Sequence, residues 1–147
     1  MSEKSLLVQD YMNRKVLTFD IRDDVADIAA TLLENRMLGA PVLDADKKVV
    51  GFVSEQDCIK EMLNTAFHCE LTATAGDVMH KGVLTVDPKM DIADLAQQMT
   101  AQRPKMYPVV SPEGKLMGLI TRADVLRALV HESANCHHPS TKATALS

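Results

Sequence analysis

Gly-Phe-Val-Ser-Glu-Gln-Asp at residues 51–57 and Gly-Leu-Ile-Thr-Arg-Ala-Asp at residues 118–124 are two copies of one pattern. Each copy reads as a glycine, the end of an apolar strand, a hydroxyl residue, two variable residues and an aspartate, and an apolar helical pattern follows. This order predicts a strand-to-helix junction, where the free N–H groups of a helix start attract anions. A hydroxyl, N–H groups and a carboxylate together suit a nucleotide, with phosphate at one end and ribose hydroxyls at the other.

The two copies belong to a longer internal repeat. A shift of 67 residues aligns Val8–Leu63 with Ala75–Val130 without a gap. Identical residues recur along the whole unit, among them the pairs Asp10/Asp77, Met12/Met79, Thr18/Thr85, Arg36/Arg103, Pro41/Pro108 and Gly51/Gly118. A gapless register over this length indicates duplication. Each copy alone has too little core, so we expect the two copies to face each other.

Each repeat follows the pattern β-α-β-β-α. In the first repeat we expect an extended segment at 16–19, a helix capped by Asp23 or Asp24, strands at 40–43 and 49–53 around a turn at 44–47, and a closing helix. The first helix keeps its apolar residues on one face, at Val25, Ile28, Ala29, Leu32 and Leu33, matched by Ile92, Leu95, Ala96 and Met99. We expect the closing helices to bury Cys58, Ile59, Met62 and Leu63, and Val125, Leu126, Leu129 and Val130.

Two prolines, Pro41 and Pro108, fall inside expected strands at equivalent places of the two repeats. Proline cannot donate to a ladder of hydrogen bonds, so it belongs at a strand start or an edge. Its recurrence predicts a strand end that something other than a neighbouring strand approaches.

The composition is that of an ordinary globular protein, with 147 residues, 46% hydrophobic residues and a net charge of −4. This charge excludes the footprint of a nucleic-acid or anionic-membrane binder, and no apolar run approaches the roughly 20 residues of a membrane span. The N-terminus opens no signal peptide, and three widely spaced cysteines indicate reduced thiols in a cytoplasmic protein. We expect a first repeat at 1–66, a linker at 67–74, a second repeat at 75–131 and a polar, disordered tail at 132–147.

Several short motifs recur in order and at matching spacing in the two repeats. They are Asp-Tyr-Met at 10–12 and Asp-Val-Met at 77–79, Val-Leu-Thr at 16–18 and 83–85, Gly-Ala-Pro-Val at 39–42 and Met-Tyr-Pro-Val at 106–109, and the two Gly…Ser/Thr-x-x-Asp stretches. In these motifs the chain resembles a pair of CBS domains, the modules named after cystathionine β-synthase. The resemblance implies an α/β (α+β) fold of two pseudo-twofold βαββα repeats packed sheet to sheet. It also implies a dimer shaped as a flat disc and adenine-nucleotide sensing in the cleft between the repeats.

The resemblance also implies which residues form two ligand sites. One site would combine Thr121 and Asp124 with Thr18, Leu38, Gly39 and Ala40, and the other Ser54 and Asp57 with Thr85, Lys105, Met106 and Tyr107. The aspartates would accept hydrogen bonds from the ribose hydroxyls, the hydroxyl residues would face phosphate oxygens, and the residues before each Pro-Val would enclose adenine. Lys105 offers a phosphate-binding cation where the first repeat has Leu38, so the two sites are chemically unequal.

Each of these assignments has a structural alternative. Ser/Thr-x-x-Asp before an apolar run is also a helix capping box, and capping and ribose binding can coexist. Lys105 can be a solvated loop residue. Cys58 lies on the apolar face of a helix, which favours a buried thiol over a nucleophile.

Other chemistry is poorly supported by the sequence. His131, Cys136, His137 and His138 cluster near the C-terminus, but adjacent histidines cannot easily face one tetrahedral ion, so we expect no metal site. No histidine lies in a strand-to-helix junction, His80 is expected to be exposed, and we expect no enzyme.

Two functions therefore remain open. The first is a regulatory module that binds AMP, ADP, ATP or a related adenosyl ligand, without a further cofactor, and acts as a homodimer on a partner protein. The second is a structural dimerisation or scaffold unit with vestigial pockets. The sequence does not name the preferred nucleotide, the partner or the pathway.

Overall fold

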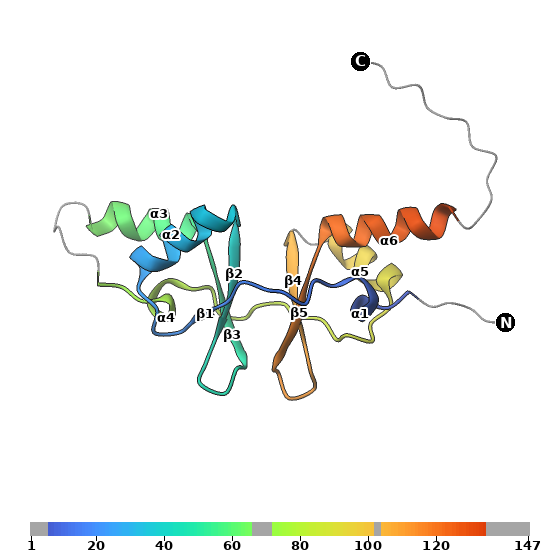
Figure 1. Cartoon of the computed structure of the whole chain (residues 1–147), viewed down its shortest axis with the longest axis horizontal. Coiled ribbons are helices and arrows are strands. Elements are labelled where there is room, and N and C mark those ends of the chain that lie inside the picture. Colours follow the sequence, from blue (N-terminus) through green and yellow to red (C-terminus); the bar gives the residue numbers. More distant parts are fainter. Residues whose placement is uncertain (1–5, 66–71, 102–103, 135–147) are drawn as a thin grey trace, which may run out of the picture.

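The computed structural model describes residues 6–65, 72–101 and 104–134, and its elements follow the expected order twice (Figure 1). The first half contains α1 (Val8–Tyr11), β1 (Phe19–Asp20), α2 (Val25–Asn35), β2 (Gly39–Leu43), β3 (Val49–Ser54) and α3 (Glu55–Thr65). The second half contains α4 (Ala75–Val78), α5 (Ile92–Ala101), β4 (Met106–Val110), β5 (Leu116–Thr121) and α6 (Arg122–Ala134). The α+β class and the repeated β-α-β-β-α unit are thus confirmed.

Each half contains a small sheet. In the first, β2 lies between β1, which is parallel to it, and β3, which is antiparallel. In the second, β4 and β5 form an antiparallel pair, and Val86 adds a parallel bridge to Val109 where the first half has β1. Of the extended segment expected at 16–19, only Phe19 belongs to a strand. The pairing of β1 with β2 begins with Phe19 opposite Val42, so the residues before Phe19 are outside the sheet.

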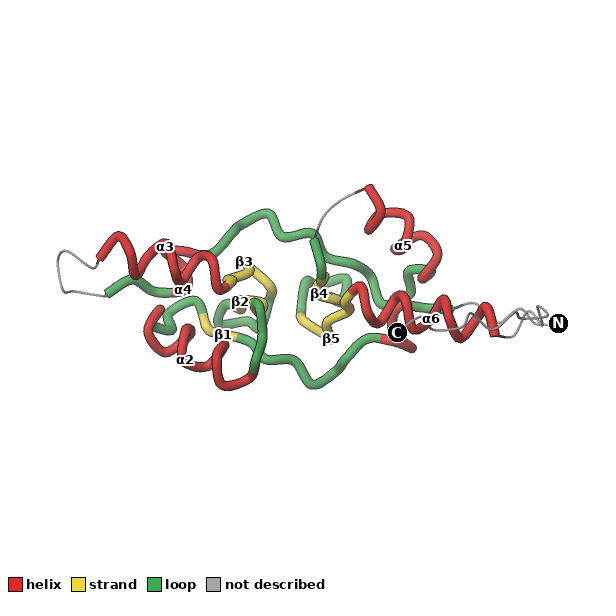
Figure 2. Tube along the Cα trace, turned by 90° about the horizontal axis from the view of Figure 1, so that it is seen from above, coloured by secondary structure: helices red, strands yellow, loops and turns green. Residues whose placement is uncertain are grey.

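The sheets lie beside each other at the centre of the molecule, and the longer helices lie on the outer sides (Figure 2). Each half has its own core. One is built around Val25, Ile28, Leu32 and Val42, and the other around Ile92, Leu95, Val109 and Ile120. The apolar residues that recur at helical spacing in α2 and α5 therefore face the cores as expected, apart from Leu33, which is exposed.

The first turn of each repeat packs into the opposite half. Val8 of α1 and Met12, which follows the last residue of α1, belong to the core of the second half. Ala75 of α4 belongs to the core of the first half. Two antiparallel backbone bridges complete this exchange: Asn13 pairs with Leu119 of β5, and His80 pairs with Phe52 of β3. The two halves are consequently held together by reciprocal exchange of their N-terminal arms.

The exchange explains the prolines inside the strands. Pro41 lies opposite Phe52, whose N–H and C=O groups bond to His80 at 3.0 and 2.9 Å. Pro108 lies opposite Leu119, which bonds in the same way to Asn13. Each proline therefore sits at a non-hydrogen-bonded position of its antiparallel pair, and its missing N–H costs that ladder nothing.

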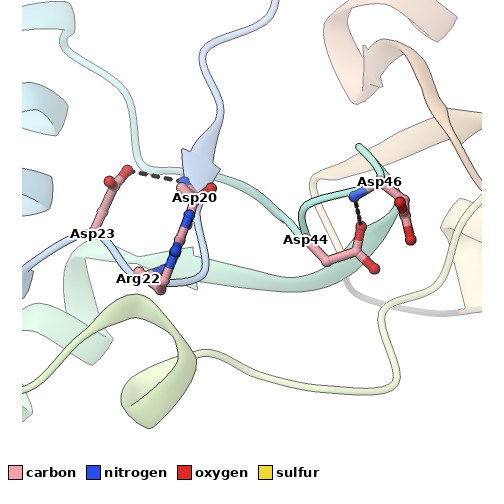
Figure 3. A network of polar contacts seen from close by, with 5 residues as sticks. All are labelled: Asp20, Arg22, Asp23, Asp44 and Asp46. Atoms are coloured by element: carbon pink, nitrogen blue, oxygen red, sulfur yellow. Dashed lines mark hydrogen bonds and ion pairs between the residues drawn. The ribbon is translucent and has the colours of Figure 1, made fainter.

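Aspartates stabilise two turns at the ends of the first sheet (Figure 3). Asp44 Oδ1 accepts hydrogen bonds from the N–H groups of Asp46 and Lys48, at 2.9 and 3.0 Å, which confirms the turn expected at 44–47. Asp23 Oδ2 accepts the Asp20 N–H at 2.8 Å. The Arg22 N–H, which donates to Asp20 Oδ1, lowers the pKa of the Asp20 carboxyl.

The closing helices correct one expectation. Among the apolar residues of these helices, Cys58 on α3 and Val125 and Ala128 on α6 are buried. The other apolar residues predicted to be buried there are exposed, namely Ile59, Met62, Leu63, Leu126, Leu129 and Val130. Helical spacing alone does not say which neighbour covers an apolar stripe, and no part of residues 6–65, 72–101 and 104–134 buries this one.

Gly118 is required by the arm exchange. A Cβ atom at Gly118 would lie 2.7 Å from Met12 Sδ and 2.9 Å from the Asn13 carbonyl oxygen. The thioether can move, but the carbonyl belongs to the backbone bridge.

We therefore expect Gly118→Ala to lower the free energy of unfolding by about 1–3 kcal/mol, as overpacking does, measured by urea denaturation. Gly51→Ala should lower the free energy of unfolding similarly, because a Cβ atom there would meet Met79 and the His80 carbonyl oxygen. Unchanged stability of both variants would contradict the exchange.

Candidate functional site

Both strand-to-helix junctions form the capping box. At the first, the Ser54 N–H and hydroxyl donate to Asp57 Oδ2 at 2.8 and 2.9 Å, and the Asp57 N–H donates to Ser54 Oγ at 3.3 Å. At the second, Thr121 and Asp124 make the same three bonds at 2.9, 3.0 and 3.2 Å. The capping alternative is therefore confirmed at both places, and one carboxylate oxygen of each aspartate serves the fold.

The other oxygen of each aspartate has a different partner. His80 Nε2 lies 2.9 Å from Asp57 Oδ1, and the two residues come from opposite repeats. At the second junction, Arg127 of the same helix reaches Asp124 Oδ1 at 2.9 Å. The Asp57 side chain is only 7% exposed, whereas that of Asp124 is 16% exposed. The two junctions thus share a backbone geometry and differ in the cation that faces the carboxylate.

The first N–H of each closing helix is used inside its own repeat. The Glu55 N–H donates to the Leu38 carbonyl at 2.9 Å, and the Arg122 N–H donates to the Lys105 carbonyl at 3.0 Å. The hairpin register also pairs Gly39 with Ser54. The residue that precedes each Pro-Val strand therefore lies beside the junction of its own repeat.

A cavity of about 630 Å³ lies next to the first junction. Both repeats line it. The first contributes Leu38, Phe52, Ser54, Glu55 and Gln56, and the second contributes His80, Lys81, Gly82, Val83, Leu84, Pro104, Lys105 and Met106. Its volume is within the range of small-molecule sites, and apolar and polar residues share the lining almost equally. The basic groups of Lys81 and Lys105 outnumber the one carboxylate, Glu55, which favours an anionic ligand.

The family model of the CBS domain matches residues 8–64 and again 75–131. The chain belongs to the CBS domain family. Within the family it is a tandem pair, as the internal repeat predicts. The pair structure also agrees with solved CBS proteins.

Relatives of this CBS pair come from archaea and plants. MJ1426, a protein of Methanocaldococcus jannaschii, is 30% identical over 155 residues, which cover 85% of this chain and 92% of that protein. CBSX2 of Arabidopsis thaliana, solved in complex with AMP, is 27% identical with a TM-score of 0.76, covering 86% of this chain and 98% of that one. The CBS domain pair of MJ0100, solved with 5′-methylthioadenosine and S-adenosyl-L-methionine, has a TM-score of 0.73 over 88% and 99% of the two chains, and at 21% identity shares the fold.

The CBS pair brings together part of the expected site. Ser54, Lys105 and Met106, from opposite repeats, line one cavity, and Leu38, which the resemblance grouped with Thr121, lines it as well. Tyr107 and Ala40 lie in the two cores, and burial raises the pKa of the Tyr107 phenol. Gly39 is buried, Thr18 is half-buried and Thr85 is exposed. Asp57 is buried and is not among the lining residues, and His80 Nε2 lies 2.9 Å from its Oδ1 atom.

Sequence reasoning missed the segment from His80 to Leu84 as part of the cavity wall. The expectation that His80 is exposed is confirmed, since its side chain is 67% exposed, but its contact with Asp57 was not foreseen. The signal lay in the order of the motifs, because this segment joins Asp-Val-Met at 77–79 to Val-Leu-Thr at 83–85 and has to cross from one half to the other.

Other candidate chemistry has a simple structural role. Cys58 is buried, and burial raises the pKa of its thiol, so it is an inert core residue. The ring of His131 lies 3.2 Å from the Tyr11 hydroxyl. Cys69, Cys136, His137 and His138 lie outside the described residues. In residues 6–65, 72–101 and 104–134, no group of three or more His, Cys, Asp or Glu could hold a metal ion, and no helix there has the length and apolarity to cross a membrane.

Removal of the Asp57 carboxylate tests its structural role. Because the Ser54 N–H and the Ser54 hydroxyl lose their acceptor, we expect Asp57→Ala to lower the free energy of unfolding by about 1–2 kcal/mol. Urea denaturation measures this loss, and Glu55→Ala, an exposed change in the same turn, serves as the control with little effect. Equal stability of both variants would show that the capping box contributes nothing.

Proposed function

We propose that this CBS pair is a regulatory module that binds an adenosine-containing nucleotide between its two repeats and acts on a partner protein. The observation that carries the proposal is the cavity in which Ser54 of the first repeat meets Lys105 and Met106 of the second. A ligand that bridges the repeats would alter how they sit together, and such a change can be read by a partner.

The lining residues suit the parts of a nucleotide. Lys105, Lys81 and the Ser54 hydroxyl would neutralise and hydrogen-bond the phosphate. Leu38, Val83, Leu84 and Met106 offer an apolar surface for adenine. Asp57 would accept from the ribose with its Oδ1 atom, since Oδ2 is used by the capping box.

A second, weaker site is proposed around Thr121 and Asp124 with Thr18, Gly39 and Ala40. Leu38 stands in the first repeat where the second has Lys105, and Asp124 is already paired with Arg127. We therefore expect one tighter site per chain, built on Ser54, Asp57 and Lys105.

The comparisons support a binding module over an enzyme. CBSX2, the relative solved with AMP, is covered almost completely by this chain. By contrast, the chain spans only 25% of the inosine-5′-monophosphate dehydrogenase of Korarchaeum cryptofilum. The likeness to that enzyme therefore ends at its CBS portion, and no catalytic function is proposed.

Ligand binding is tested by thermal unfolding with AMP, ADP, ATP, NAD and S-adenosylmethionine. A ligand that binds only the folded state raises the midpoint by mass action. For the ligand that gives the largest shift, we expect Asp57→Ala to weaken binding about tenfold or more and Lys105→Ala to weaken binding of phosphate-bearing ligands. The 2′-deoxy analogue should lose affinity with the unmodified protein and not with Asp57→Ala. If no nucleotide shifts the midpoint, a structural scaffold with vestigial pockets is the better description.

A homodimer is proposed from the uncovered stripes on α3 and α6. Ile59, Met62 and Leu63 correspond by the repeat to Leu126, Leu129 and Val130, so the two stripes are related by the pseudo-twofold axis. A second copy of the chain can cover both stripes with the same two stripes of its own, which is the symmetry of an isologous interface. Two pairs joined in this way would give the expected disc.

Light scattering at micromolar concentration tests the dimer. We expect twice the mass of the chain, and we expect Leu63→Glu to yield a folded monomer, because a buried carboxylate without a partner opposes association. Leu63 is 66% exposed within the chain, so the substitution should not harm the fold itself. Asn64→Glu adds the same charge one residue further along α3 and should leave the dimer intact. A monomer before substitution would refute the dimer.

A further inference from the structure

His80 lines the cavity and stands against the buried Asp57 carboxylate. Asp57 is buried and is not among the lining residues, whereas His80 is. The imidazole Nε2 of His80 stands 2.9 Å from Asp57 Oδ1. A ribose that enters the cavity therefore meets His80 before it meets the acceptor that the proposed function assigns to it.

The Oδ1 atom is the part of the Asp57 carboxylate that the capping box leaves unused. The Oδ2 atom accepts the Ser54 N–H and the Ser54 hydroxyl, and His80 Nε2 lies 2.9 Å from the Oδ1 atom. Each oxygen of a carboxylate offers about two lone-pair sites, so the two Ser54 bonds fill those of Oδ2, and His80 stands against those of Oδ1. A ribose presents two hydroxyls, and both can reach the Oδ1 atom only when His80 has left it.

The His80 side chain can move away from Asp57 while the His80 backbone stays in place. Its backbone is fixed to β3 by two bonds with Phe52, at 3.0 and 2.9 Å. Its side chain is 67% exposed, and its ring nitrogen Nε2 contacts Asp57 Oδ1. Rotation of the ring therefore breaks this contact and leaves the backbone bridge in place.

We propose that His80 is a latch on Asp57, which competes with the ribose hydroxyls for Oδ1 and so sets the affinity of this site. The inference rests on the proposed function and deepens it. It makes His80 a residue whose removal tightens binding, whereas removal of a ligand contact would weaken it.

The latch distinguishes the two junctions. At the position equivalent to His80 the first repeat has Asn13, and Asp124 is held instead by Arg127 of its own helix. The contact at the first junction therefore joins the two repeats, whereas the pair at the second junction lies within one helix.

Calorimetry with adenosine tests the latch, because adenosine carries no phosphate that could titrate or bind the lysines. At neutral pH we expect His80→Ala to bind adenosine about threefold to tenfold more tightly than the unmodified protein. His131→Ala removes an exposed histidine of α6 outside the cavity lining and should retain the affinity of the unmodified protein. Thermal unfolding confirms that each variant is folded.

The outcomes separate the latch from the proposed function. If neither protein binds adenosine or AMP, the proposed function falls and the latch with it. If His80→Ala binds adenosine equally well or less well than the unmodified protein, only the latch is refuted. If His80→Ala weakens AMP alone, His80 is a phosphate contact, and the latch is likewise refuted.

Discussion

The pairing of each N-terminal arm with the opposite half is the constraint on which the rest of the structure depends. Asn13 bonds to Leu119, and His80 bonds to Phe52, in each case through both backbone groups. The bonds of His80 fix this residue beside Phe52 of β3, and the segment that it begins, from His80 to Leu84, forms one wall of the cavity. They also place Met12 and Met79 against the two glycines that open the repeated motif. The duplicated sequence thus folds as two mixed halves, each completed by the other.

Patterns within short stretches of sequence were sufficient to predict the helices, the hairpins and the two strand-to-helix junctions. The helix at 25–35, the hairpin around 44–47 and the Ser/Thr-x-x-Asp junctions all follow from patterns within about ten residues. Interactions of this kind depend on spacing along the chain, on turn residues and on caps, so a sequence records them directly. The duplication added the long-range information that the halves face each other.

Contacts between distant segments could not be predicted in the same way. The sequence does not show that His80 meets Asp57, because the two are brought together by the crossing of an arm that no periodicity marks. Similarly, the apolar spacing of Ile59 and Leu63 predicts a covered stripe but not what covers it. The sequence places Tyr107 before Pro108 but does not show that its side chain belongs to the core of its own half. Alternation along β4 accounts for this placement, since neighbouring residues face opposite sides.

The two oxygens of each junction aspartate have different duties. The capping box uses Oδ2 of both aspartates with nearly equal distances, and a change there would weaken the start of a helix. The Oδ1 atoms take no part in the box, and there the repeats differ, with His80 beside one and Arg127 beside the other. A substitution of either cation therefore changes the partner of Oδ1 and leaves the capping box in place. One repeated backbone geometry can in this way present two chemically different carboxylates.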